Sequence, residues 1–423
     1  MKGMNGKRPK IRFPEFTDDW EKRKLGDVIA KLTGGASIAP DDYVEDGYRT
    51  IPKGAVNDTG VANMSGCKNV SESFFMRNIS SKTSTGELVT SLRDLVPTAP
   101  NMGRIVRICG EYEDFLMPQG VYSIILNENM DEDFLIAYSN SPEYRKIIMT
   151  EKNGSTQVHI RNGEFLDIDI PIPSFEEQRK IGKFFSDFDN RIFIYQEKLE
   201  HLKLLKKSLL QKMFPKKGEE VPEFRFPGFT DDWEQRKLGE WCNFINGDRS
   251  SNYPSTTEFV EDGIPFVGSD SLGSTLVDKT KLRFITSEKY EQMNGLKIEK
   301  NDILYTLRGA GFGKCSIADF TEGTVASSLV GIRCTESLRA KFLIQWLSSR
   351  NAENEKNKAV NGSTAQNISV EDMKKYCISV PCIAEQDKIS EHLYNLDNLI
   401  TLHQRKLEHI KELKKYMLQN MFV

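Results

Sequence analysis

Apolar side chains recur with alternating steps of four and three in two long stretches of the chain. Such spacing is typical of a coiled-coil seam rather than of an ordinary amphipathic stripe. We therefore predict one long helix in each stretch, ~60 Å long at ~1.5 Å per residue. The seam positions are Ile181, Phe185, Phe188, Ile192, Tyr195, Leu199 and Leu202 in the first stretch, and Ile389, Leu393, Leu396, Ile400, His403, Leu407 and Ile410 in the second, each 208 residues further on.

Both stretches begin just after a proline, Pro173 and Pro381, which favours an extended residue before a helix. In the first, Ser174 and Glu177 have the spacing of a capping box. The helices could each pack on a globular neighbour, or they could pack on each other. We expect them to pair, because each seam is too long for a small domain to cover and one chain supplies two.

The chain is a tandem repeat. Fourteen residues from Phe13 to Gly26 recur from Phe226 to Gly239 with only two differences, and the segment Asn-Gly-Ser-Thr that starts at Asn153 recurs at Asn361. Each half therefore reads as a head motif, a body and a long helix. The predicted boundaries are 1–170 for the first body, 171–215 for the first helix, 216–222 for a linker, 223–380 for the second body and 381–423 for the second helix.

The two bodies have diverged, but short apolar runs mark corresponding places. Leu88–Arg93 and Ile303–Arg308 read as equivalent strands, and Tyr122–Leu126 reads as another strand. Phe134–Tyr138 and Phe342–Leu347 read as helix cores. Gly, Asn and Pro between such runs indicate many turns. The fold class is therefore α+β: two mixed α/β bodies in tandem, each followed by a long helix.

Composition limits the cellular location and the kinds of ligand that we expect. The 423 residues are 38% hydrophobic and lack an apolar run of about 18 residues, so we expect neither a membrane span nor a secretory signal. Seven scattered cysteines without a Cys-x-x-Cys pair indicate reduced thiols and a cytoplasmic location, with no metal site. The formal charge of −3 means that any contact with nucleic acid needs local segregation of charge.

Candidate chemistry is confined to basic and amide side chains in loops. Residues 309–316 resemble a phosphate-binding loop. They lack the first glycine of that motif, where Arg308 stands, and the Ser or Thr after its lysine, where Cys315 stands. The segment is therefore either a plain turn or a loop close to DNA. Arginine reads guanine, Asn and Gln read adenine, and other basic groups meet phosphate. The candidate DNA-binding residues are Arg49, Lys53, Arg93, Asn101, Arg104, Arg107, Lys152, Ser155, Thr156, Gln157, Arg249, Ser269, Arg308, Lys314, Lys358, Ser363, Thr364 and Gln366.

Three recurring features have more than one interpretation. The Gly-Ser-Thr loops suit phosphate contact or loop architecture, because features shared by both halves are poor readers of different sequences. Trp20 and Trp233 are either core residues or docking residues for a common partner. The lysines that end each helix form either a solvated face or a contact with a partner or with the DNA backbone.

Catalytic patterns are missing. We find no amino-methylation motif, no nuclease carboxylate cluster and no Gly-x-Ser-x-Gly, so chemistry must come from partners. Identical docking surfaces suit one kind of partner bound twice, whereas unlike bodies suit two unlike ligands.

The doubled head, with Trp20 and Trp233 each followed by Arg-Lys-Leu-Gly, and the Gly-Ser-Thr segment before Glu-x-Gln together resemble the specificity subunit of a type I restriction-modification system. The resemblance implies two target recognition domains, each reading one half of a split double-stranded DNA site, spaced by an antiparallel coiled coil. It also implies two methyltransferase subunits and two restriction subunits as partners. S-adenosylmethionine, ATP and Mg²⁺ would be bound only by those partners. The alternatives are a coiled-coil scaffold that dimerises a partner without reading DNA, and a subunit with its own nuclease activity.

Overall fold

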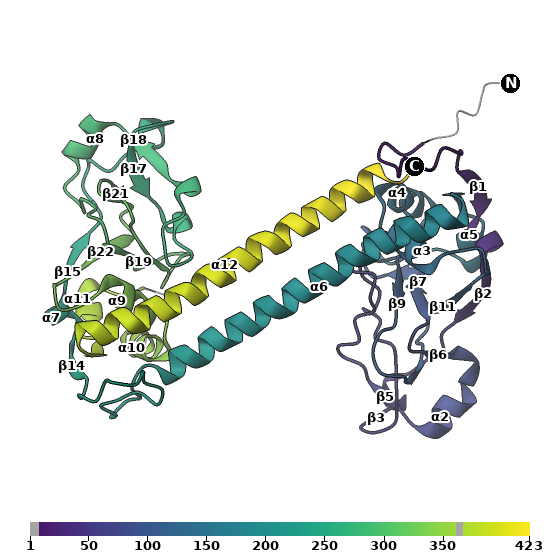
Figure 1. Cartoon of the computed structure of the whole chain (residues 1–423), viewed down its shortest axis with the longest axis horizontal. Helices are drawn as coiled ribbons and strands as arrows, with labels where there is room; N and C mark the ends of the chain where they lie inside the picture. The colour runs from purple at the N-terminus through teal and green to yellow at the C-terminus, as the bar shows by residue number, and fades with distance from the viewer. Residues whose placement is uncertain (1–7, 361–366) are drawn as a thin grey trace. The chain divides into compact units, whose positions relative to one another are not determined.

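The computed structural model describes residues 8–360 and 367–423 (Figure 1). The chain divides into two compact units: unit 1 is Met1–Gln196 with Lys406–Val423, and unit 2 is Glu197–Arg405. Each unit contains one mixed α/β body and parts of two 38-residue helices. These helices are α6 (Phe175–Lys212) and α12 (Ile383–Asn420).

The body of unit 1 is organised around a four-stranded antiparallel sheet in the order β2-β11-β7-β9. Its strands are β2 (Ile29–Gly34), β11 (Val121–Leu126), β7 (Leu88–Ser91) and β9 (Ile105–Arg107). Every residue of β7 is buried, as expected for a central strand covered on both faces. The strands predicted from Leu88 and Tyr122 onward are confirmed.

Helices α3 (Glu132–Ser139) and α4 (Pro142–Glu151) supply aromatic side chains to the core of unit 1. Side-chain oxygens fix where both begin: Asp131 accepts a hydrogen bond from the N–H of Phe134, and Ser141 accepts one from the N–H of Tyr144. The predicted helix core at Phe134–Tyr138 is confirmed. The remaining elements of unit 1 are β1 (Glu21–Lys24), α1 (Leu25–Val28), η1 (Pro40–Asp42), β3 (Tyr43–Val44), β4 (Tyr48–Arg49), β5 (Asn69–Val70), α2 (Glu72–Arg77), η2 (Ile79–Ser81), β6 (Lys82–Ser84), β8 (Arg93–Asp94), β10 (Asp114–Leu116), β12 (Val158–His159), α5 (Asn162–Leu166) and β13 (Asp169–Ile172).

The body of unit 2 repeats the same strand order as β15-β22-β19-β20, so the duplication extends to the sheet. It differs by a second four-stranded sheet, β16-β18-β17-β21, with its own core around Phe266. The helix predicted at Phe342 is α9, and the strand predicted at Ile303 is β19. The elements are β14 (Glu234–Lys237), α7 (Leu238–Trp241), β15 (Cys242–Asn246), η3 (Thr256–Glu258), β16 (Phe259–Val260), β17 (Ile264–Val267), η4 (Ser269–Ser271), η5 (Lys279–Lys281), β18 (Arg283–Ile285), α8 (Ser287–Gln292), β19 (Ile303–Thr306), β20 (Cys315–Ile317), β21 (Thr324–Val325), β22 (Leu329–Cys334), α9 (Ala340–Leu347), α10 (Arg350–Val360), α11 (Val370–Lys374) and β23 (Cys377–Val380).

The two long helices pair as an antiparallel coiled coil, as predicted, and all fourteen seam side chains are buried or half-buried. In unit 1, Lys414 of α12 forms an ion pair with Asp189 of α6. In unit 2, Lys206 of α6 forms an ion pair with Asp397 of α12. Asp189 and Lys206 are seventeen residues apart on α6, and Lys414 and Asp397 are the same seventeen apart in the opposite direction on α12. Both units therefore keep one register.

The end of each helix is held by an aromatic cluster. In unit 1, the Phe422 ring just after α12 lies 5.7 Å from the Phe134 ring and 6.3 Å from the Trp20 ring. In unit 2, the Phe214 ring after α6 lies 5.5 Å from Phe342 and 6.2 Å from Trp233. The bodies of both units thus use the same ring positions to hold a helix end.

Both tryptophans of the head motif lie in the cores: Trp20 is 8% exposed and Trp233 is 4% exposed. This burial supports the core-packing alternative and leaves little surface for a docked partner. Beside them, Arg12 binds Glu177 at 2.7 Å, and its counterpart Arg225 binds Glu385 at 2.8 Å.

The capping box predicted at the start of α6 is only half formed. The N–H of Glu177 donates to the Ser174 hydroxyl at 3.4 Å, but the Glu177 carboxylate accepts from Arg12 and from the Trp20 indole. A buried carboxylate gains more from a charge-assisted pair than from a backbone N–H. The carboxylate therefore ties the head motif to the helix and does not cap the helix.

Candidate nucleic-acid interface

Two features predicted from the sequence meet in the body of unit 1. The arginine that follows the buried strand β7 lies on β8, and β8 pairs with β12 so that Arg93 is opposite His159. Strand β12 comes directly after the Asn-Gly-Ser-Thr-Gln segment. The strand end and the polar loop therefore form one surface.

The same pairing recurs in unit 2. Arg308 follows β19 and forms an antiparallel bridge with Asn367, the residue after the second segment, Asn-Gly-Ser-Thr-Ala-Gln. Arg308 is exposed, and its guanidinium donates to the carbonyl of Ser327 at 3.1 Å. The predicted residues Ser363, Thr364 and Gln366 lie outside the described residues. Even so, the equivalent bridge identifies equivalent surfaces on the two bodies.

The loop at 153–157 is a tight turn. Asn153 and His159 exchange backbone hydrogen bonds of 2.8 and 2.9 Å. Gly154 has a φ of +104°, and a Cβ there would lie 2.3 Å from the carbonyl oxygen of Gln157, so only glycine fits. The side chains of Ser155, Thr156 and Gln157 are exposed on this turn. Small donors and an amide on a rigid turn suit contacts with phosphate or base edges.

A second loop, 95–103, lies beside this turn in unit 1. Lys152 donates to the carbonyl of Pro97, and Arg145 donates to the carbonyls of Met102 and Ala99, both at 2.6 Å. Burial lowers the pKa of Arg145 to about 10. The sequence reasoning did not single out Arg145, because its position within a helix does not show that it faces a neighbouring loop. It holds the loop in place, and Asn101 is presented half-exposed on that loop.

Several candidate residues have partners inside their own body. Arg49 forms an ion pair with Glu113 at 2.9 Å, and Arg107 binds Glu132 and Asp133. Arg104 donates to Pro100 and to Asn140, and burial lowers its pKa. These partners compete with phosphate for the guanidinium groups. Their proposed contact with DNA stays a prediction.

The glycine-rich segment of unit 2 is the turn of a hairpin between β19 and β20. Thr306 donates to the carbonyl of Lys314 at 2.8 Å, and Gly313 donates to the carbonyl of Thr306 at 3.0 Å. These backbone N–H groups are used within the hairpin, which differs from a nucleotide cradle that points them at phosphate. Lys314 is exposed on the turn, and Gly311 packs against Ser269. Lys53 and Arg249 are exposed on other loops.

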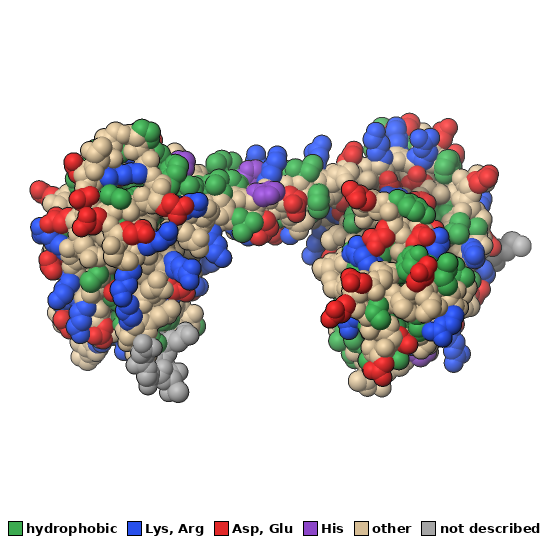
Figure 2. Space-filling view, turned by 90° about the horizontal axis from the view of Figure 1, so that it is seen from below, with side chains coloured by type: hydrophobic (Ala, Val, Ile, Leu, Met, Phe, Trp, Pro, Cys, Tyr) green, Lys and Arg blue, Asp and Glu red, His purple; other side chains and the backbone are tan. Residues whose placement is uncertain are grey.

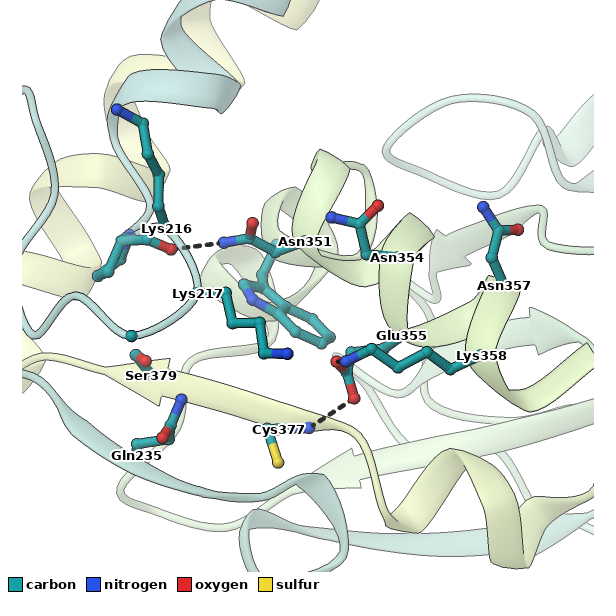
Figure 3. Close-up of a pocket in the computed structure, with 13 residues that line it drawn as sticks. Lys216, Lys217, Gln235, Asn351, Asn354, Glu355, Asn357, Lys358, Cys377 and Ser379 are labelled. Carbon is teal, nitrogen blue, oxygen red and sulfur yellow. Dashed lines mark hydrogen bonds and ion pairs between the residues drawn. The ribbon is translucent and has the colours of Figure 1, made fainter.

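A hollow of about 670 Å³ lies beside α10 in unit 2 (Figure 3). Asn351, Asn354 and Asn357 of α10 line it, and Trp346 is also among the lining residues. Lys358 is held there by Glu355 on the same helix. Among the described residues, no group of three or more His, Cys, Asp or Glu side chains could hold a metal ion. The hollow is lined mainly by amides and amines, together with the carboxylate of Glu355 and the thiol of Cys377.

No helix in the described part of the chain is long and apolar enough to cross a membrane. A family model described as "Type I restriction modification DNA specificity domain" matches the chain twice, over residues 17–204 and 230–412. The two matches cover most of both halves, in agreement with the duplicated sheet.

The chain is 27% identical to the type I restriction enzyme MjaVIII specificity subunit of Methanocaldococcus jannaschii, over 98% of this chain and 93% of that protein. It is 23% identical to the EcoBI specificity subunit of Escherichia coli, over 61% of this chain and 58% of that protein. The fold is similar to the crystal structure of a type I restriction-modification S subunit from M. genitalium, with a TM-score of 0.68, 16% identity and 99% coverage of both chains. The chain therefore belongs to the type I restriction-modification DNA specificity family and is a specificity subunit, not a catalytic subunit.

Proposed function

We propose that each body is a target recognition domain that reads one half of a bipartite, asymmetric double-stranded DNA site. The observation that carries this proposal is the repeated pairing of a strand-end arginine, Arg93 or Arg308, with a polar loop on bodies that otherwise differ. A framework shared by both bodies suits contact with the phosphate backbone, whereas loops whose side chains differ between the bodies can read different bases. The second sheet of unit 2 adds to that difference.

The coiled coil sets the distance between the half-sites and docks two methyltransferase subunits. Apolar side chains are exposed at equivalent positions of the two helices: Ile194 and Leu402 are each 48% exposed, and Leu205 and Leu413 are 49% and 37% exposed. Figure 2 shows hydrophobic side chains on the surface of the helices. Exposed apolar side chains indicate an interaction surface. Two equivalent sets support one kind of partner bound twice.

Catalysis and its cofactors belong to the partners in this proposal. Two methyltransferase subunits bind S-adenosylmethionine, and two restriction subunits bind ATP and Mg²⁺. The assembly works on DNA in the cytoplasm. The chain itself supplies recognition and spacing.

A body exchange tests the proposal. Residues 27–170 are replaced by the corresponding body of another family member, and the complex with the methyltransferase is expressed in cells that lack other methylation. We expect methylated sites in which one half-site has changed while the other half-site and the spacing are retained. Single-molecule sequencing of the genomic DNA measures all three. A change in both half-sites would contradict independent readers.

The scaffold alternative is separated by a binding measurement. The complex is titrated with a duplex that carries the methylated site and with shuffled duplexes of equal length. A reader of DNA prefers the first duplex by a factor of ~10³ or more. A scaffold binds all of them alike.

A further inference from the structure

Each long helix ends in the same arrangement of three lysines. The middle lysine has a structural role in both helices, because Lys206 pairs with Asp397 and Lys414 pairs with Asp189, with side chains only 19% and 9% exposed. The outer two need another explanation. The lysines are Lys203, Lys206 and Lys207 on α6, and Lys411, Lys414 and Lys415 on α12.

The outer lysines are available to an external anion. Lys203 and Lys411 are 44% and 42% exposed, and within the described residues the ion-pair partner of each is a glutamate one turn earlier. Exposed pairs of this kind are worth little in water. Lys207 and Lys415 are exposed and form no ion pair with any residue in the described part of the chain.

In unit 2 these lysines border a hollow of about 560 Å³ where α6 passes the body. Four basic side chains and one acidic side chain line the hollow, so its charge is positive, and two apolar and two neutral polar residues also line it. The basic residues are Lys203, Lys206, Lys207 and Arg350, the acidic residue is Glu353, and the apolar residues are Leu210 and Ile400. Figure 2 shows basic side chains on the surface of the helices.

We propose that the outer lysines of both helices, Lys203 with Lys207 and Lys411 with Lys415, bind backbone phosphates of the DNA. The inference rests on the proposed function and adds a contact that the bodies do not make. A surface that reads bases must differ between unlike half-sites, whereas phosphate is the same along any duplex. These lysines recur in both repeats although the bodies have diverged. Lysine also suits phosphate as a point charge that needs no fixed orientation.

The salt dependence of binding tests the proposal. Fluorescence anisotropy measures the affinity of the complex with methyltransferase for its methylated site and for a shuffled duplex, at salt concentrations between about 50 and 200 mM. We compare the wild type with K203Q/K207Q and with K411Q/K415Q. Each double variant should reduce the steepness of the plot of log affinity against log salt by ~2, because each phosphate contact that forms releases about 0.9 of a counterion and two contacts are lost. The affinity for both duplexes should fall equally, on the order of tenfold.

The matched control is K183Q/R405Q, which removes one exposed cation from each helix. The repeat counterparts of these residues are the acids Glu391 and Glu197, so they are not part of the recurring arrangement. The control should keep the wild-type slope. Wild-type slopes in both lysine variants would overturn the proposal, as would lost copurification of the methyltransferase with an unchanged slope. If the wild type binds both duplexes alike, the proposed function fails. If the wild type prefers its methylated site but both lysine variants keep the wild-type salt slope, only the assignment of the lysines fails.

Discussion

The ion pair between Arg12 and Glu177 shows that a recurring residue can be identified from the sequence while its role, structural or docking, cannot. Arginine precedes Phe-Pro in both heads, and glutamate follows the start of both helices. The repeat therefore contained the signal for this pair. Recurrence does not tell a buried partner from an exposed docking residue, because both are retained in two copies of a fold. The carboxylate of Glu177 is only 1% exposed, and its hydrogen bond raises the pKa of Arg12.

Gly154→Ala tests the rigid turn that carries the polar loop. The positive φ and the carbonyl of Gln157 leave no room for a methyl group, so the turn must open. We expect a loss of ~1–3 kcal/mol in stability and weaker binding to DNA. Thermal unfolding and anisotropy measure the two effects. The matched control is Gly163→Ala in α5, where a Cβ meets nothing within 4 Å. An equal effect of both substitutions would contradict the steric argument.

Glu258 gives a prediction for the dependence of stability on pH. Hydrogen bonds from Ser255 and from Lys289 lower its pKa from 4.5 to about 2. The lowered pKa stabilises the folded chain above pH 4.5, and this contribution is lost as the pH falls towards 2. Glu258→Gln should therefore lower the melting temperature at pH 6 and have less effect at pH 3. A difference in melting temperature that does not change with pH would show that the carboxylate charge is not responsible.

At the scale of elements, the spacing of apolar residues and the Gly, Asn and Pro residues between apolar runs were enough to predict the strands β7, β11 and β19, both long helices and the seam. Each of these elements has an apolar pattern that its own local sequence defines. The second sheet of unit 2 could not be predicted in this way, because β16 and β21 have only two residues each and are stabilised by neighbours distant in the sequence. The pairing of Arg93 with His159 could not be predicted from the sequence either, because pairing between distant segments leaves no periodic signal. The loops of the candidate interface could therefore be predicted from the sequence, but their proximity in the fold could not.

The two helix–helix ion pairs belong to this scale. Asp397 accepts from Lys206 and also from Thr275 at 2.8 Å and Gln345 at 2.9 Å, so Asp397→Asn leaves the half-buried Lys206 without its charged partner. We expect a loss of ~2–3 kcal/mol from this substitution and partial recovery when Lys206→Met is added. Urea unfolding of the four chains of a double-mutant cycle measures the coupling. If the two effects were additive, the ion pair would contribute no coupling of its own.

At the scale of the whole molecule, the two repeats use the same contacts between their helices. The ion pairs Lys206–Asp397 and Lys414–Asp189 use corresponding residues of the two repeats, with the helices exchanged. The duplicated helices therefore share these contacts, whereas the bodies differ in their sheets. In the proposed function, the helices set the distance between half-sites and the bodies read their sequences. Changes in the helices should then alter spacing alone.

Matched heptad insertions test that separation. One heptad is inserted between Gln196 and Glu197 of α6, and another between Arg405 and Lys406 of α12, so that the antiparallel register is kept on both sides. Seven residues add ~10 Å of helix, which corresponds to about three base pairs at ~3.4 Å each. We expect both half-site sequences to stay the same and the spacer between them to lengthen by about three base pairs, as measured by sequencing of methylated DNA. A heptad in α6 alone shifts the seam against α12 and should destabilise the coiled coil instead. An unchanged spacer in the matched variant would show that contacts outside the helices set the distance.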